Sequence, residues 1–141
     1  MNKVTVALAV IVKNNRVLLT LRNDPARPSI HLHWQLPGGG VKKGETLSEA
    51  CIREAQEETG LSIKILSQKP YVIHSIFEGT DFVLCSFLAE AISGTINSQK
   101  DEETADAKWM EISEVKKLPT LQDTETMINK AIEYARTTST N

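Results

Sequence analysis

Alternating and continuous runs of apolar residues divide the chain into several short strands and two helices. Residues 4–12 and 17–21 are rich in β-branched and other apolar side chains, and the polar turn 13–16 between them predicts a hairpin. Further strands are predicted, in chain order, at residues 63–66, 71–77, 82–89 and 108–112. Strands therefore outnumber helices in the predicted fold.

Capping residues mark the first helix. Thr46 and Glu49 fit a capping box, and Gly60 suits the position just past a helix end, so we expect the helix to run from Leu47 to Thr59. A second amphipathic helix is predicted at residues 122–136, after Pro119, which interrupts regular secondary structure. Because the first helix lies between strands, the pattern predicts an α/β or α+β fold with a mixed sheet between helices.

Length and composition indicate one globular domain. The 141 residues suffice for a single core, so we expect one domain over 1–141, with residues 137–141 as a flexible tail. A net charge of −2 argues against non-specific nucleic-acid binding. The apolar run 4–12 is too short to cross a bilayer, so no membrane partner is expected.

The two cysteines suggest a reducing compartment. Cys51 and Cys85 lack the spacing of a metal site, and both fall in predicted core positions. We therefore expect free buried thiols, a pattern that favours a cytoplasmic location.

Three acids at the end of the first helix are the strongest chemical signal. Glu54, Glu57 and Glu58 share one face, which continues the apolar stripe of the preceding turns. The helix dipole disfavours negative charge at this end, and partly buried carboxylates that lack a counter-charge are costly. A solvated acidic surface is the alternative, but a hard divalent cation explains the arrangement better; Mg²⁺ suits carboxylate oxygens, with Mn²⁺ as a substitute.

The glycine loop and this helix together resemble the signature of the Nudix hydrolases, G-x5-E-x7-R-E-U-x-E-E-x-G-U, where U is a bulky aliphatic residue. Every spacing is kept, and the box covers about a sixth of the chain. Its positions are filled by Gly39, Glu45, Arg53, Glu54, Ala55, Glu57, Glu58, Gly60 and Leu61. Ala55 is smaller than a typical U residue. The resemblance implies an α/β/α sandwich.

Roles for the acids follow from the same resemblance. It implies that Glu57 and Glu58 are metal ligands, together with the backbone carbonyl of Gly38, and that Glu54 is either a ligand or the base that activates water. Arg53 would orient a ligand glutamate, although a simple surface pair with Glu57 is the alternative.

A second acidic segment supplies a further candidate for the active site. In the run 101–103, Glu102 or Glu103 would be the additional loop acid that the family often uses, unless the loop is only solvated.

Substrate-binding candidates lie before and after the box. Arg22 would bind phosphate, with Arg27 as a weaker candidate. Gly39 would approach the substrate closely, and Phe82 and Leu84 would line a base pocket or the core.

The implied activity is Mg²⁺-dependent hydrolysis of a nucleoside diphosphate linked to another group. The short chain favours a nucleoside or deoxynucleoside triphosphate, including an oxidised one, cleaved to the monophosphate and pyrophosphate. The alternatives are ADP-ribose or a dinucleoside polyphosphate as substrate, or a non-catalytic nucleotide-binding regulator. The family also suggests a homodimer.

Overall fold

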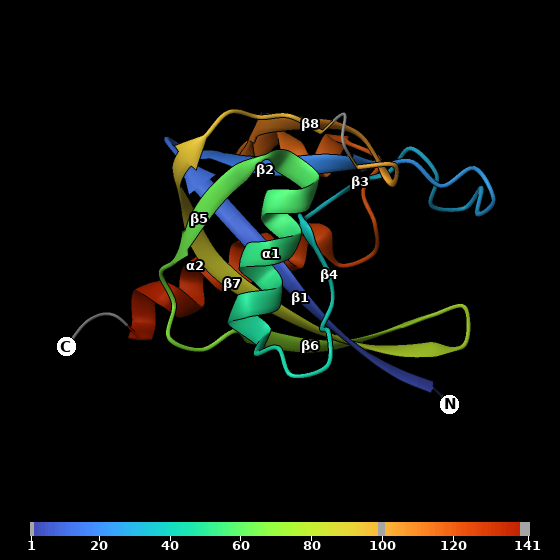
Figure 1. The fold of residues 1–141 in the computed structure, drawn as a ribbon, viewed down its shortest axis with the longest axis horizontal. Helices are drawn as coiled ribbons and strands as arrows, with labels where there is room; N and C mark the ends of the chain where they lie inside the picture. The colour runs from blue at the N-terminus through green and yellow to red at the C-terminus, as the bar shows by residue number, and fades with distance from the viewer. Residues whose placement is uncertain (1, 99–100, 139–141) are drawn as a thin grey trace.

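The computed structural model describes residues 2–98 and 101–138. Two α-helices and eight strands make up most of the fold (Figure 1). The helices are α1 (Leu47–Thr59) and α2 (Thr124–Thr138), and a 3-10 helix, η1, spans Ile112–Lys117. The strands are β1 (Asn2–Lys13), β2 (Arg16–Arg22), β3 (Trp34–Gln35), β4 (Gly38–Gly40), β5 (Leu61–Ile65), β6 (Tyr71–Phe77), β7 (Thr80–Gly94) and β8 (Thr104–Glu111).

Strand β1 lies at the centre of one mixed sheet. It runs parallel to β7, from Asn2 opposite Thr80 to Ile11 opposite Ala89, and antiparallel to β2 and β4. Strand β7 also pairs antiparallel with β5 and β6, while β2 pairs with β3 and β8. The parallel pair at the centre requires a long connection between β1 and β7, and that connection carries α1.

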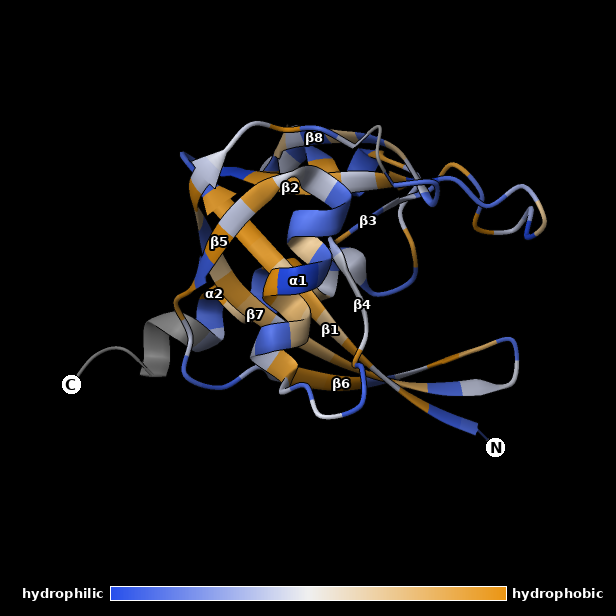
Figure 2. Ribbon diagram, in the orientation of Figure 1, coloured by the Kyte–Doolittle hydropathy of each residue, from blue (hydrophilic) through white to orange (hydrophobic). Residues whose placement is uncertain are grey.

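The two helices cover opposite faces of this sheet (Figures 1 and 2). Successive residues of β1 point to opposite faces, so Ala7, Ala9 and Ile11 join the core beneath α1, whereas Leu8 and Val10 join the core beneath α2. Both faces of β1 are therefore buried, which explains its continuous apolar run. The predicted α/β/α sandwich with a mixed sheet is confirmed.

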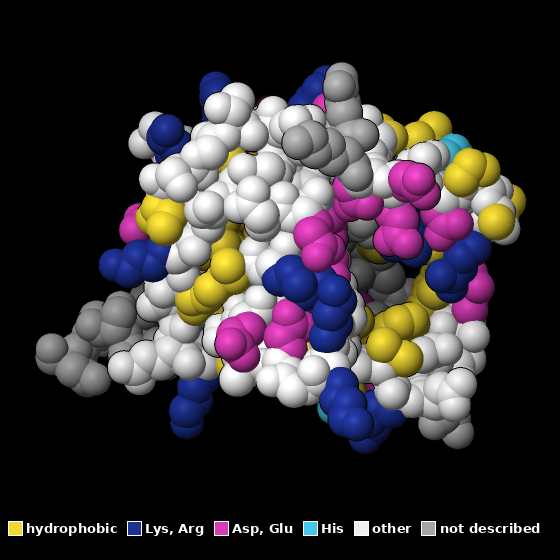
Figure 3. All heavy atoms as spheres, in the orientation of Figure 1, with side chains coloured by type: hydrophobic (Ala, Val, Ile, Leu, Met, Phe, Trp, Pro, Cys, Tyr) yellow, Lys and Arg dark blue, Asp and Glu magenta, His cyan; other side chains and the backbone are white. Residues whose placement is uncertain are grey.

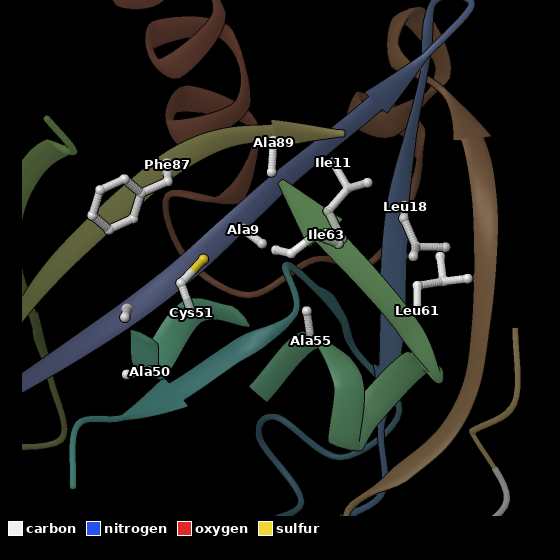
Figure 4. Packing of buried hydrophobic residues seen from close by; sticks show 11 residues of the cluster. Ala9, Ile11, Leu18, Ala50, Cys51, Ala55, Leu61, Ile63, Phe87 and Ala89 are labelled. Atoms are coloured by element: carbon white, nitrogen blue, oxygen red, sulfur yellow. The ribbon is translucent and has the colours of Figure 1, made fainter. Parts of the chain in front are cut away.

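Small side chains bring α1 close to the sheet. Ala50, Cys51 and Ala55 are fully buried against the layer that contains Ala7 and Ala9 of β1 (Figure 4). Larger residues at these positions would force the helix outward or strain the packing. The small residue at position 55 is thus matched by alanines on the sheet, and the close approach places the acidic end of α1 beside β4.

The strand predictions differ from the structure mainly in their ends. Strand β8 begins at Thr104 rather than at residue 108, because its polar first half pairs with β2, as in the pair of Thr20 with Ala107. Strand β7 continues past residue 89 to Gly94 through its pairing with β5. The strands β3 and β4 and the 3-10 helix were not predicted as separate elements.

The remaining fold expectations have mixed outcomes. Cys51 and Cys85 are free and buried, as predicted. Helix α2 extends through Thr138, two residues into the expected tail, and residues 139–141 lie outside the described part of the chain. Over the described ranges, we find no helix with both the length and the apolar character needed to cross a bilayer.

Candidate active site

Helix α1 is fixed at both ends, which sets where its acids lie. The Thr46 side chain accepts a hydrogen bond from the Glu49 backbone, and the Glu49 side chain accepts one from the Thr46 backbone, so the predicted capping box is present. Gly60 ends the helix with φ 79°, a left-handed conformation that glycine adopts without strain. The predicted bounds, Leu47–Thr59, are those observed.

The three acids of α1 have different surroundings. Glu58 is buried, with only 6% of its surface exposed, and its Oε1 accepts a hydrogen bond from the Gly38 backbone N–H at 3.2 Å. The Glu54 side chain is 18% exposed, whereas that of Glu57 is 50% exposed. The acidic face therefore runs from the interior of the protein to its surface.

Arg53 connects these acids to the loop before the helix. Its guanidinium donates to both Glu45 oxygens, at 2.6 and 3.0 Å, and to Glu54 Oε1 at 2.8 Å. Further bonds reach Glu57 at 3.2 Å and the Gly40 carbonyl oxygen at 3.1 Å. Bidentate binding of a carboxylate fixes both partners in one geometry. Arg53 is thus part of a network rather than a simple pair with Glu57, and Glu45 joins the loop to the helix.

The pKa values of the acids at this site shift in opposite directions: the pKa of Glu45 is lowered and that of Glu58 is raised. Hydrogen bonds from Arg53 lower the pKa of the Glu45 carboxyl to about 2. The same bonds raise the pKa of Arg53, with Glu45 as the main cause. Burial raises the pKa of Glu58 well above its usual value, and the neighbouring Glu54 raises it further. Glu58 is therefore the acid that most needs a positive charge in order to ionise.

The charge of an acid in a distant loop also acts on Glu58. The negative charge of Asp101 adds to the rise in the Glu58 pKa. Asp101 is held in place because its carboxylate accepts hydrogen bonds from the Glu103 backbone N–H at 3.1 Å and the Thr104 hydroxyl at 2.8 Å. Glu102 and Glu103 are exposed, and their backbone carbonyls accept hydrogen bonds from Asn23.

Two glycines allow the backbone of β4 to lie against these acids. Gly38 has φ 152°, and a Cβ there would collide with the Ala7 carbonyl oxygen. At Gly39, a Cβ would lie 2.7 Å from the Glu54 carboxyl group. A side chain at Gly38 would therefore disturb the pairing of β4 with β1, and one at Gly39 would displace the Glu54 carboxyl group.

The chemistry of the acids fits a hard divalent cation. Glu54 and Glu58 interact closely enough to raise the Glu58 pKa, and such a pair of carboxylates is stabilised by a shared cation or a shared proton. Over the described residues, no three acidic, histidine or cysteine side chains form a ready-made metal cluster. The carboxylates of Glu54 and Glu57 instead point to Arg53. To bind a cation together with Glu54 and Glu58, the Glu57 carboxylate would therefore have to reorient.

A pocket opens beside the acids. It has a volume of about 240 Å³, and Gly38 and Gly39 form part of its wall. The five residues predicted to bind substrate all line it: Arg22, Arg27, Gly39, Phe82 and Leu84. Figure 3 shows acidic and basic side chains gathered around a hollow on this face of the molecule.

The pocket wall also contains residues that the sequence did not indicate. Ser75 and Phe77 come from β6, Ile30 from the loop after β2, and Gln122 from the segment before α2. Arg22 is held by Asp24 at 3.1 Å and by the side-chain oxygen of Gln35 at 3.4 Å. Only the pairing of β6 with β7 and the packing of α2 bring these segments together, so no local signal could have identified them.

Comparison with known proteins identifies the family of the chain. The family model for the NUDIX domain matches residues 1–130. The chain is 30% identical over 115 residues to a putative nudix hydrolase 1 of Caenorhabditis elegans, covering 79% of this chain and 30% of that protein. It is 32% identical over 119 residues to an ADP-ribose pyrophosphatase of Methanocaldococcus jannaschii, covering 79% of this chain and 62% of the relative.

A solved structure supports the fold over nearly the full length. A MutT NUDIX hydrolase from Burkholderia pseudomallei aligns with a TM-score of 0.77 and 25% identity, covering 92% of this chain and 98% of that one. The chain spans about a third of the worm relative and less than two thirds of the archaeal one. The NUDIX domain model matches residues 1–130, and the fold and the acidic helix α1 agree with that match. The chain therefore belongs to the Nudix hydrolase family.

Proposed function

We propose that the protein hydrolyses a nucleoside triphosphate to the monophosphate and pyrophosphate and that the reaction requires Mg²⁺. One observation carries this proposal: the buried acid Glu58 and its neighbour Glu54 lie against the two glycines that form the wall of a pocket containing Arg22 and Arg27. A phosphate chain that extends from a base in the pocket would meet the arginines and then the acids. Cleavage of a phosphoanhydride needs this combination of positioning and charge neutralisation.

The acids and the Gly38 backbone would hold the cation. Glu57 and Glu58 supply carboxylate oxygens, with Glu54 as a further ligand or as the base, and the Gly38 carbonyl completes the proposed set. When bound, Mg²⁺ supplies positive charge that offsets the negative charge of the phosphate oxygens. Mn²⁺ would serve as a substitute because it accepts similar oxygen ligands.

The other residues prepare this site. Arg53 fixes Glu45 and one oxygen of Glu54, which leaves the second Glu54 oxygen available to take a proton from the attacking water. Asp101, rather than Glu102 or Glu103, is our candidate for the additional loop acid, because its charge acts on Glu58. Arg22 and Arg27 would bind the phosphate chain through charge-assisted hydrogen bonds.

The size of the pocket favours a substrate with one base. A volume of about 240 Å³ lies just below the usual range of ligand pockets, about 300–1,000 Å³, and suits a single nucleobase. ADP-ribose remains the second candidate, because the relative from Methanocaldococcus jannaschii is named as an ADP-ribose pyrophosphatase. A non-catalytic regulator is the third candidate, but all the acids of the family signature are present in this chain.

A nucleotide panel tests the proposal. The purified protein would be incubated with Mg²⁺ and each of the common nucleoside triphosphates, 8-oxo-dGTP, ADP-ribose and a dinucleoside polyphosphate. Released monophosphate and pyrophosphate would be measured. We expect a triphosphate to be the best substrate. Faster turnover of ADP-ribose would replace that assignment, and tight binding with no Mg²⁺-dependent product would favour the regulator.

A further inference from the structure

An ion pair and a hydrogen bond join the two segments that project beside the pocket. The loop between β2 and β3 and the turn between β6 and β7 extend from the same side of the molecule (Figure 1). Arg27 Nη2 lies 3.8 Å from Glu78 Oε2, and the Ser29 hydroxyl donates to Glu78 Oε1 at 3.0 Å. Arg27 lines the pocket, as does Phe77, the neighbour of Glu78. One carboxylate therefore joins two walls of the pocket.

The backbone of the turn at Glu78 is strained. Glu78 and Gly79 connect β6 to β7, with φ values of 48° and 78°. Two positive φ values are typical of a type I′ turn, in which asparagine, aspartate or glycine is preferred at the first position. Glutamate rarely adopts this left-handed conformation. Strain of this kind persists where surrounding contacts fix the residue, and Ser29 and Arg27 fix the Glu78 side chain.

The loop that carries Ser29 is bonded internally around Arg27. The Arg27 backbone N–H donates to the Asp24 carbonyl oxygen at 3.0 Å, and the Arg27 carbonyl oxygen accepts from the Ile30 N–H, also at 3.0 Å. The Ile30 side chain is buried and lines the pocket. A displacement of the Arg27 backbone would therefore move Ile30 as well, so release of Arg27 and Ser29 from Glu78 would free a whole section of the pocket wall.

The two arginines of the pocket are held with different strength. Arg22 donates two hydrogen bonds to one oxygen of Asp24, at 3.1 and 3.2 Å, and the two side chains are only 27% and 21% exposed. The Arg27–Glu78 pair is longer, at 3.8 Å, and its side chains are 44% and 51% exposed. An exposed pair at this distance contributes little, because water screens the charges. Arg27 is therefore the arginine that can exchange its carboxylate for another anion.

This exchangeable pair lies where the phosphate chain of a nucleotide would pass. A volume of about 240 Å³ accommodates a base, so the ribose and the phosphate chain must extend from the pocket towards the arginines. A triphosphate carries several negative charges, whereas Glu78 carries one, and arginine binds phosphate through charge-assisted bonds. A phosphate chain that reaches Arg27 would therefore displace Glu78 from it.

We propose that Glu78 holds the mouth of the pocket closed in the nucleotide-free protein by binding Arg27 and Ser29, and that the phosphate chain opens it by replacing Glu78 at Arg27. This inference rests on the proposed function, since it assumes a nucleotide in the pocket. The closed contact reduces the fraction of molecules that can accept a nucleotide, and the apparent affinity falls by the same fraction. Glu78 thus acts on the entry of the nucleotide and not on the chemical step.

Stopped-flow binding of a nucleotide that resists cleavage tests this closure. The probe is N-methylanthraniloyl α,β-methylene-ATP with Mg²⁺, in which a methylene group replaces the oxygen between the α and β phosphates. Glu78→Gln removes the charge that faces Arg27 and keeps the length of the side chain, so the association rate constant should rise about two- to fivefold. The dissociation rate constant should change less than about twofold, because the contact is already broken in the complex.

Two further variants separate the closure from a general effect of charge. Ser29→Ala removes the neutral half of the contact and changes no charge, so its association rate constant should also rise, by about twofold. Asp81→Asn removes a negative charge from the same hairpin, where Asp81 is paired with His74, and should associate at close to the wild-type rate. Added salt should reduce the difference between Glu78→Gln and wild type, because salt screens an exposed pair.

The outcomes are distinct for the closure and for the proposed function. Equal association rates for wild type, Glu78→Gln and Ser29→Ala overturn the closure while hydrolysis of a triphosphate stands. A rise in Glu78→Gln that Ser29→Ala does not share, or that Asp81→Asn equals, is an effect of charge alone and also overturns it.

Faster association in Glu78→Gln and Ser29→Ala, without hydrolysis of any triphosphate, supports the closure and overturns the proposed activity. If neither the wild-type protein nor Glu78→Gln binds the probe, the closure fails, and the nucleotide panel decides the activity separately.

Discussion

Apart from Asp101, the acidic half of the site comes from one continuous stretch, residues 38–58, whereas the pocket beside it is assembled from four separate segments. In the acidic half, Arg53 holds the carboxylates of Glu45, Glu54 and Glu57, and the Gly38 backbone N–H holds that of Glu58. In the pocket, strand β1, the stretch from β2 to β4, the β6–β7 pair and the start of α2 each contribute side chains. The chemistry is thus built locally, and the choice of substrate depends on tertiary packing.

This contrast predicts different kinetic effects in the two halves. Changes in the acidic half should lower kcat, because they remove charge from the reacting centre. Changes in the pocket should act mainly on KM and on the preference for a base.

The largest effect is expected at Glu57. Glu57→Gln keeps the size of the side chain but removes its charge, so kcat should fall on the order of 100- to 1,000-fold while the fold is retained. Steady-state kinetics with Mg²⁺ and a melting curve would measure both. Glu133→Gln, at an exposed acid of α2, is the matched control, and an unchanged kcat for Glu57→Gln would remove that residue from the site.

Arg53→Lys should give the next largest loss. Lysine keeps the charge but cannot bind Glu45 through two bonds while also reaching Glu54 and Glu57. We expect kcat to fall towards the upper end of the range of about 10- to 100-fold that is typical for residues that orient ligands. Arg16→Lys, at an exposed pair with Glu111, should have no effect. Equal activity in both variants would mean that the Arg53 network is only structural.

Asp101→Asn should have a smaller effect on kcat, towards the lower end of about 10- to 100-fold. The reason is that Asp101 acts on Glu58 only through its charge. Glu102→Gln and Glu103→Gln, measured in the same assay, should be close to wild type. A larger loss in either of those two variants would restore the original assignment of the loop acid.

Phe82→Leu should distinguish the kinetic role of the pocket from that of the acids. The substitution keeps apolar volume but removes a ring on which a base can stack, so KM should rise several-fold, about 1 kcal/mol, with little change in kcat. Kinetics over a range of substrate concentrations would show this. A fall in kcat with a constant KM would place Phe82 in the catalytic half instead.

The smallest effect is expected on stability, at Glu58. Since burial raises its pKa in the folded protein above the reference value of 4.5, the folded state keeps a proton that the unfolded chain loses. The stabilisation is complete below the unfolded pKa and is lost as pH rises through the folded pKa.

Glu58→Gln cannot titrate, so it should melt about 2–4 °C higher than wild type at about pH 8 without metal. Its kcat should fall no further than that of Glu57→Gln. Melting curves across the pH range would measure the difference. A Glu58→Gln variant that melts lower than wild type at every pH would show that the buried carboxylate is already stabilised without a cation.

The same contrast explains what the sequence could predict. The bounds of α1 and the acids on its face follow from capping and helical spacing, which are local. The first half of β8 could not be predicted, because its polar residues form a strand only through pairing with β2. The hydrogen bonds of Ser75 with Gln122 and Asp123 join residues that are separated by 47 and 48 positions in the sequence. These bonds therefore depend on how α2 packs against β6. The effect of the Asp101 charge on Glu58 likewise depends on tertiary packing, because the two residues are far apart in the sequence.

A titration with Mn²⁺, followed by the electron paramagnetic resonance signal of the free ion, tests the central claim that the acidic end of α1 holds a divalent cation. The wild-type protein should remove Mn²⁺ from solution through a site that excess Mg²⁺ displaces, and both Glu57→Gln and Glu58→Gln should weaken that binding strongly. Equal binding by the wild-type protein and both variants would contradict a cation site at these residues.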